Sequence, residues 1–160
     1  MINLISSDSL TQLSQAAKET TRLRTNLKFH TRNEAHCHRL LNALEPGTYI
    51  PPHRHQDMEK DETMIVLKGR LGVLIFDDVG TVIEQFIMAE NGTNLGVTIP
   101  AGVFHSMVAL ESGSVFFESK AGPYAALTDA EKASWAPSEG DADSAAFLEK
   151  MKTLFIAHAE

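Results

Sequence analysis

The sequence contains a single cysteine, Cys37, and no long hydrophobic run. One cysteine cannot form an intrachain disulfide, and such cysteine usage is typical of a reducing compartment. No apolar stretch approaches the roughly 18 residues needed to cross a bilayer. The N-terminus also lacks the basic and apolar regions of a signal peptide. Together these absences favour a cytoplasmic location with no membrane as partner.

Positive charge is also scarce. The chain has 14 lysine and arginine residues against 21 aspartate and glutamate residues, a net charge of −7. This balance argues against nucleic acid as a partner, because a basic surface is needed to neutralise phosphates. The length of 160 residues suits one domain with a core of its own.

The middle of the chain consists of short segments rich in β-forming residues, each closed by turn residues. Eight such segments suggest a sandwich or a barrel. They are "HRLLNAL", "TYI", "TMIVL", "RLGVLIF", "TVIEQFIM", "LGVTI", "SMVAL" and "SVFFESK". We therefore expect an N-terminal helical segment over residues 1–24, a β-barrel over 25–124 and a C-terminal helical extension over 125–160.

Helices are predicted at both ends. Ser7, Asp8 or Ser9 is predicted as the N-cap of the first helix, in which Leu10 and Leu13 lie on one face. Near the other end, "LTDAEKASW" carries a capping-box pattern with Thr128 and Glu131 three residues apart. A second helix is expected in "DADSAAFLEKMKTLFIAHA", which places several large apolar residues on one face.

Three histidines carry the main chemical signal. His53 and His55 point to the same side if the chain is extended, which Pro51 and Pro52 favour. His105 follows a Pro-x-Gly turn at the start of another β segment. Three imidazoles with one carboxylate would form a mononuclear metal site with open positions. The spacing alone does not decide among the nearby acidic residues, which are Asp57, Glu59, Asp61 and Glu62.

The spacing of these residues resembles the two motifs of the cupins. The first spans Gly47 to Gly69 around His53-x-His55, and the second is Pro100-x-Gly102-x-x-His105. The resemblance implies a mainly β fold, the double-stranded β-helix or jelly-roll barrel, with an N-terminal helix and C-terminal helices. It also implies metal ligands. The cupin glutamate stands seven residues before the closing glycine, which selects Glu62, with Glu59 as the alternative.

Two positions depart from the cupin pattern. Ala109 stands where the second motif usually has asparagine, and Asn94 stands where it usually has glycine. Neither change removes a ligand, but both would alter the turn and the cavity wall.

Longer stretches are similar to WbuC-type cupin metalloproteins. They are "HRLLNALEPGTYIPPHRH", "LKGRLGVLIFDDVG", "PAGVFHSMVALESGSVFFESKAGPY" and "ASWAP". That family is associated with bacterial surface-polysaccharide (O-antigen) gene clusters. The resemblance implies a metal-binding cupin and brings no settled reaction.

Other polar residues are candidates for contacts with a substrate. Glu118 and Lys120 share one face of a strand, so both enter the cavity or both face outward, and Tyr124 follows them. We predict them as substrate-binding residues. Glu59, His36 and His38 are the acid–base candidates by residue type. Arg54 must point away from the metal face, and neither His30 nor His158 is assigned a role.

These features predict a small enzyme that uses one divalent transition metal, either Fe, Mn, Ni or Zn, on a sugar or sugar-derived metabolite. Isomerisation, epimerisation, hydrolysis and dioxygenation all suit such a site. One alternative is a non-catalytic cupin that binds a small molecule or metal. Another is a metal-free sugar epimerase that works through a His–Asp pair. A homodimer is plausible, because a barrel of this kind has open edges.

Overall fold

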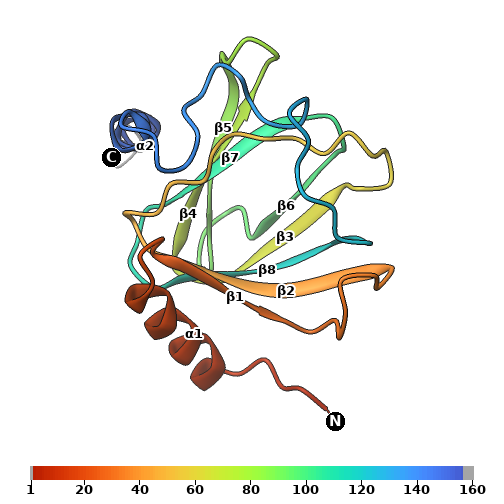
Figure 1. Cartoon of the computed structure of the whole chain (residues 1–160). Coiled ribbons are helices and arrows are strands. Elements are labelled where there is room, and N and C mark those ends of the chain that lie inside the picture. The colour runs from red at the N-terminus through yellow and green to blue at the C-terminus, as the bar shows by residue number, and fades with distance from the viewer. Residues whose placement is uncertain (1, 157–160) are drawn as a thin grey trace.

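The computed structural model describes residues 2–156, which form two antiparallel sheets with a helix at each end of the chain (Figure 1). None of the helices in that range is long and apolar enough to cross a membrane. The elements in chain order are α1 (Ser7–Glu19), β1 (Arg24–Lys28), β2 (Cys37–Leu44), β3 (Glu62–Lys68), β4 (Arg70–Phe76), β5 (Val82–Ala89), β6 (Gly96–Ile99), β7 (Phe104–Ala109), β8 (Ser114–Ala121) and α2 (Ser144–Thr153).

The strands form a five-stranded sheet in the order β1-β2-β8-β3-β6 and a three-stranded sheet in the order β5-β4-β7. β3 leads into β4 through Gly69, so this turn joins the two sheets. Gly69 has a positive φ of 80°, and a side chain there would meet the backbone of Ser114 at 2.9 Å. A glycine is therefore required at this turn. Two antiparallel sheets of this kind are consistent with a jelly roll, and the mainly β prediction is confirmed.

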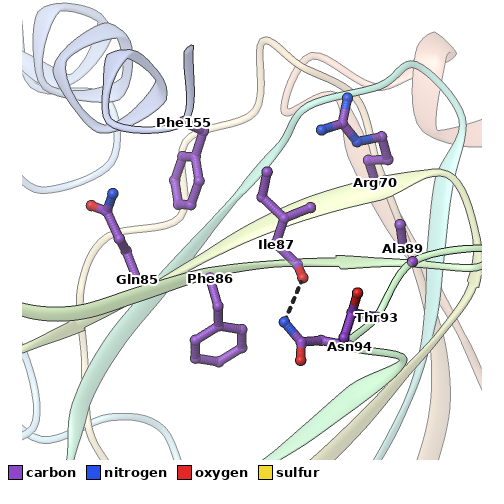
Figure 2. A pocket seen from close by; sticks show the side chains of 9 residues that line it. Arg70, Gln85, Phe86, Ile87, Ala89, Thr93, Asn94 and Phe155 are labelled. Atoms are coloured by element: carbon purple, nitrogen blue, oxygen red, sulfur yellow. Dashed lines mark hydrogen bonds between the residues drawn. The ribbon is translucent and has the colours of Figure 1, made fainter. Parts of the chain in front are cut away.

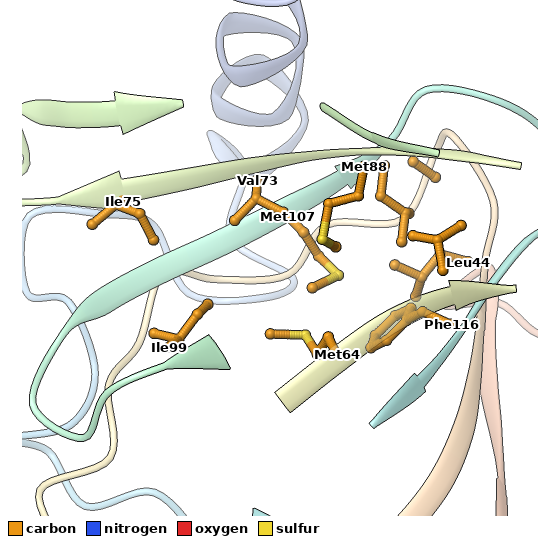
Figure 3. Packing of buried hydrophobic residues seen from close by; sticks show 11 residues of the cluster. Leu44, Met64, Val73, Ile75, Met88, Ile99, Met107 and Phe116 are labelled. Atoms are coloured by element: carbon orange, nitrogen blue, oxygen red, sulfur yellow. The ribbon is translucent and has the colours of Figure 1, made fainter. Parts of the chain in front are cut away.

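The main core lies between the two sheets. Side chains from β2, β3, β6 and β8 meet side chains from β4, β5 and β7, and Figure 3 shows Met64, Met107 and Phe116 among them. Alternation along each strand explains why these residues point inward together. This apolar cluster forms the floor of the cavity that His53 and His105 also line.

The outer face of each sheet is covered by a helix or by the C-terminal segment. Leu10 and Ala17 of α1 pack on Leu41 and Val115 of the five-stranded sheet. Leu148 and Met151 of α2, with Phe155, cover the three-stranded sheet. β4 and β7 are consequently buried on both faces, which explains their nearly continuous apolar sequences.

The structure corrects several predicted elements. β1 was not predicted, and "TYI" (residues 48–50) is not a strand. The N-cap of the first helix is Ser6, whose side chain accepts a hydrogen bond from the backbone N–H of Ser9, and not Ser7, Asp8 or Ser9. The predicted helix in "LTDAEKASW" is wrong. Glu131 does accept bonds from Thr128, but the segment pairs with the histidine loop instead of winding into a helix.

Candidate metal centre

His53 and His55 lie on the segment between β2 and β3, which runs beside the start of β7. The backbone N–H of His53 donates to the carbonyl of His105 at 3.1 Å, and the N–H of His105 donates back at 2.9 Å. This bridge brings two histidines that are far apart in the sequence into one cluster. Their ring centroids lie 4.6 Å apart.

Residues 131–133, which follow β8, hold the loop that carries His53 and His55 from its other side. The backbone N–H of Arg54 donates to the carbonyl of Glu131 at 2.9 Å, and Ala133 donates to Pro52 at 3.2 Å. The carboxylate of Glu131 also accepts a bond of 2.9 Å from the backbone N–H of Gln56. Hydrogen bonds from the backbone N–H groups of Thr128 and Gln56 lower the pKa of Glu131 to about 2. Glu131 therefore positions the histidine loop.

Glu62 opens β3 and supplies the carboxylate that faces the histidines. Its side chain is 5% exposed. Nε2 of His55 lies 2.9 Å from Oε1 of Glu62, and Nε2 of His105 lies 3.1 Å from Oε2. One ligand atom from each of His53, His55 and Glu62 falls within 4.8 Å of the others. This donor set of imidazoles and one carboxylate suits a divalent metal.

The hydrogen bonds of the rings test whether a metal fits. Nδ1 of His53 lies 3.0 Å from the carbonyl oxygen of Pro51, and Nδ1 of His105 lies 2.9 Å from that of Val103. A carbonyl only accepts, so each Nδ1 carries the proton and a neutral ring keeps its lone pair on Nε2. For His105 this lone pair faces the Glu62 carboxylate, which is also an acceptor. Two acceptors at that distance need a cation between them, either a proton or a metal ion.

The electrostatics favour ligation at neutral pH. Burial, with a smaller contribution from the neighbouring His105, lowers the pKa of His53 to about 4. Burial alone would raise the pKa of Glu62, but the contacts of its carboxylate with the His105 and His55 rings and the charge of Lys120 outweigh burial and hold this pKa below its usual range. A neutral imidazole and an ionised carboxylate are the forms that bind a metal.

Glu118 and Lys120 of β8 face the interior. Nζ of Lys120 lies 2.6 Å from Glu62 and 2.7 Å from Glu118, and Asn42 of β2 donates to Glu118 at 2.7 Å. Burial would lower the pKa of Lys120, but the charges of Glu118 and Glu62 outweigh it and raise that pKa. These side chains line a cavity of about 160 Å³ together with His53, Glu62 and His105, above an apolar floor that includes Met64 and Phe116.

The other predicted residues are distributed unevenly around this centre. His38 is buried and lines a second cavity beside His53 and His55, with Tyr124. His36 and Glu59 are exposed and lie outside the linings of both cavities. Arg54 points away, as predicted, and stacks on Phe104 while pairing with Asp78.

Sequence patterns do not predict a role for some of the residues near this centre. His30 stacks on His38 with ring centroids 4.0 Å apart, although no role was assigned to it. Lys60 lines the second cavity, and Glu131 positions the histidine loop. Only long-range pairing places Glu131 there, so its sequence neighbourhood shows nothing but a helix cap. His158 lies outside the described residues.

Comparison with known families and structures places the chain. Residues 5–88 match a family described as a domain of unknown function, DUF6016. The chain belongs to this family. No curated protein matches the sequence.

Two solved structures have a similar fold, and the matched region spans most of each of those chains. KdgF from Halomonas sp. is 15% identical, with a TM-score of 0.50 over 64% of this chain and 82% of that chain. The conserved SPY1581 protein of unknown function from Streptococcus pyogenes is 19% identical, with a TM-score of 0.53 over 78% of this chain and 91% of that chain. At these identities the similarity concerns the fold, which is that of the cupins.

Proposed function

We propose that this DUF6016 protein is a divalent-metal-binding cupin of the WbuC type. The observation that carries this proposal is the shared Glu62 carboxylate, which two imidazoles face from two different segments of the chain. His53, His55, Glu62 and His105 would hold one ion of Fe, Mn, Ni or Zn. Such an ion would polarise a hydroxyl, carbonyl or carboxylate oxygen of a bound molecule, or activate water or O2.

The surrounding residues support a small metal-dependent enzyme that acts on a sugar or sugar-derived metabolite in surface-polysaccharide biosynthesis. Lys120 and Glu118 present polar groups to the cavity, and Asn42 fixes the orientation of Glu118. Side chains that donate and accept hydrogen bonds above an apolar floor suit a polyhydroxylated ligand. Among the predicted acid–base candidates, His38 is the one that lines a cavity at the centre.

A non-catalytic binding protein is the second candidate. It is favoured by the exposed positions of His36 and Glu59, since a general base must reach the proton that it abstracts. The metal-free epimerase is less well supported, because the carboxylate beside the histidines is a glutamate shared by two rings. Turnover of a panel of nucleotide sugars would favour the enzyme, whereas saturable binding without turnover would favour the binding protein.

Elemental analysis of the purified protein tests the metal site. We expect about one equivalent of a transition metal in the wild type and none in His53→Ala/His105→Ala, with the circular dichroism of the barrel unchanged. His30→Ala/His36→Ala is the matched control, because it removes two histidines that do not contact Glu62. Full metal retention in His53→Ala/His105→Ala would contradict the assignment of these histidines as metal ligands.

A cytoplasmic location and a homodimer belong to the same proposal. The single cysteine supports the first. The second is supported by edge strands β1 and β6 of the larger sheet and β5 and β7 of the smaller one. Sedimentation analysis at several concentrations would establish the oligomeric state.

A further inference from the structure

A second cavity of about 260 Å³ reaches the histidines His53 and His55 from outside the barrel. Its wall combines the loop before β3, the end of β8 and the segment that follows β8. Lys120 and His53 line both this cavity and the one inside the barrel, so the two cavities adjoin at the candidate metal centre. A ligand in the outer cavity would therefore lie beside His53, His55 and Lys120.

The charge of the outer cavity differs from that of the whole protein. The chain carries a net charge of −7, yet none of the described residues that line this cavity is a carboxylate. Lys60 and Lys120 are its charged lining residues. The rest of the lining is His38, His53, His55, Ala121, Pro123, Tyr124, Ala125 and Leu127. Although the protein is acidic overall, the charged groups that line this cavity are positive.

The two lysines are not equivalent. Lys120 is held between Glu62 and Glu118, and these two carboxylates compensate its charge. Lys60 donates to the carbonyl oxygen of Pro123 at 3.0 Å, and among residues 2–156 it forms no ion pair. Its ammonium has three donors, of which this bond uses one. The remaining donors and the full charge of Lys60 are available to a ligand.

We infer that the outer cavity binds the anionic oxygen group of a small molecule, a carboxylate or a phosphate, through the ammonium of Lys60. Tyr124 and Leu127 form the less polar wall beside it. The inference rests on the proposed function, because the remainder of the ligand would extend toward His53 and His55. It narrows the ligand class from a sugar to an acidic or phosphorylated sugar derivative.

Titration calorimetry of the metal-loaded protein with D-glucuronate, D-glucose 6-phosphate and D-glucose tests this inference. The three probes share a ring and differ in charge at one end. We expect at least one charged probe to bind about tenfold or more tightly than glucose, since a charge-assisted hydrogen bond is lost with the neutral sugar. The tighter of the two charged probes identifies the anionic group. Lys60→Gln should reduce its affinity about tenfold, and Lys150→Gln, which removes an exposed lysine of α2, should not.

Metal content, measured on each sample, separates the two proposals. A wild-type protein without metal would refute the proposed metal site. If metal is retained, three results would each overturn the anion site alone. These are glucose binding as tightly as both charged probes, no binding of either charged probe at millimolar concentration, and equal effects of Lys60→Gln and Lys150→Gln.

Discussion

Nζ of Lys120 lies 2.6 Å from Oε1 of Glu62, the same oxygen that faces Nε2 of His55 at 2.9 Å. The strand register enforces this contact, because Glu62 of β3 is paired directly with Lys120 of β8. One carboxylate oxygen thus lies between a permanent cation and a metal-ligand candidate. The lysine and a bound metal would draw on the same negative charge.

Replacing Lys120 by glutamine should therefore strengthen metal binding. Removal of a nearby positive charge relieves its repulsion of a dication, and we expect about a tenfold gain in affinity. Competition with a chelator of known affinity measures this gain. Lys132→Gln, which alters an exposed lysine paired with Asp129, is the control. Weaker binding in Lys120→Gln would mean that the lysine chiefly orients Glu62.

The choice of carboxylate ligand can be tested by exchanging each candidate for its amide. Glu62→Gln keeps the shape of the side chain but removes the charge that faces His55 and His105. Its metal affinity should fall by about 100-fold or more, since even residues that only support ligands are worth 10–100-fold. Glu59→Gln alters an exposed loop residue and should leave the affinity unchanged. The reverse order of effects would assign the ligand to Glu59.

The stabilisation that Glu131 gives to the loop carrying His53 and His55 should depend on pH. Its pKa is lowered from 4.5 to about 2 in the folded protein, so the stabilisation is complete above pH 4.5 and is lost as the pH falls toward 2. Glu131→Gln should lower the free energy of unfolding by about 1 kcal/mol at pH 7, allowing for solvent screening of this partly exposed group. Urea unfolding at pH 7 and pH 3 measures the change.

The difference between the wild type and Glu131→Gln should be clearly smaller at pH 3 than at pH 7. Glu149→Gln, which removes a surface pair with Lys152, controls for the loss of one carboxylate. A pH-independent difference would show that the glutamine disturbs packing and not a charged hydrogen bond.

The contact between Gly72 and Phe155 provides a stability test remote from the metal centre. A methyl group on Gly72 of β4 would meet the ring of Phe155 at 2.6 Å. Gly72→Ala should cost about 1–3 kcal/mol, because the buried ring must shift. Thermal unfolding of Gly72→Ala, Phe155→Ala and the double variant measures the coupling. A double variant whose loss equals the sum of the single losses would contradict a direct clash.

The same region contains a cavity of about 490 Å³ beside Phe155, and Figure 2 shows the side chains that line it. Asn94 closes one end of it by donating to the carbonyl of Ile87 at 3.2 Å. This residue occupies the position where the cupin pattern usually has glycine. The side chain of Asn94 thus bonds back to β5, and Asn94 lines neither of the two cavities at the candidate metal centre.

Sequence patterns predicted most of the strands, because their residues either alternate between apolar and polar or are continuously apolar. They missed β1, whose sequence "RTNLK" has a single large apolar residue and lies at a sheet edge. The helix signal of Thr128 and Glu131 failed for a different reason. The local hydrogen bonds of a cap form, but pairing with the histidine loop determines the path of the chain.

For the candidate site, motif spacing was enough to group His53, His55, Glu62 and His105, and the structure does place them together. The direction in which Lys120 points could not be read from a short strand, because either face was compatible with its alternation. The register of β8 between β2 and β3 determines that direction. Register depends on contacts across the whole sheet, which no local pattern contains.

Pairing of the histidine loop with residues 131–133 also has a consequence for biosynthesis. The ribosome completes all eight strands by Ala121, before it makes Glu131 and Ala133. A chain that stopped before Glu131 would contain every strand of the two sheets but would lack backbone partners on one side of the segment carrying His53. Completion of the candidate metal pocket on that side therefore depends on residues that follow the last strand.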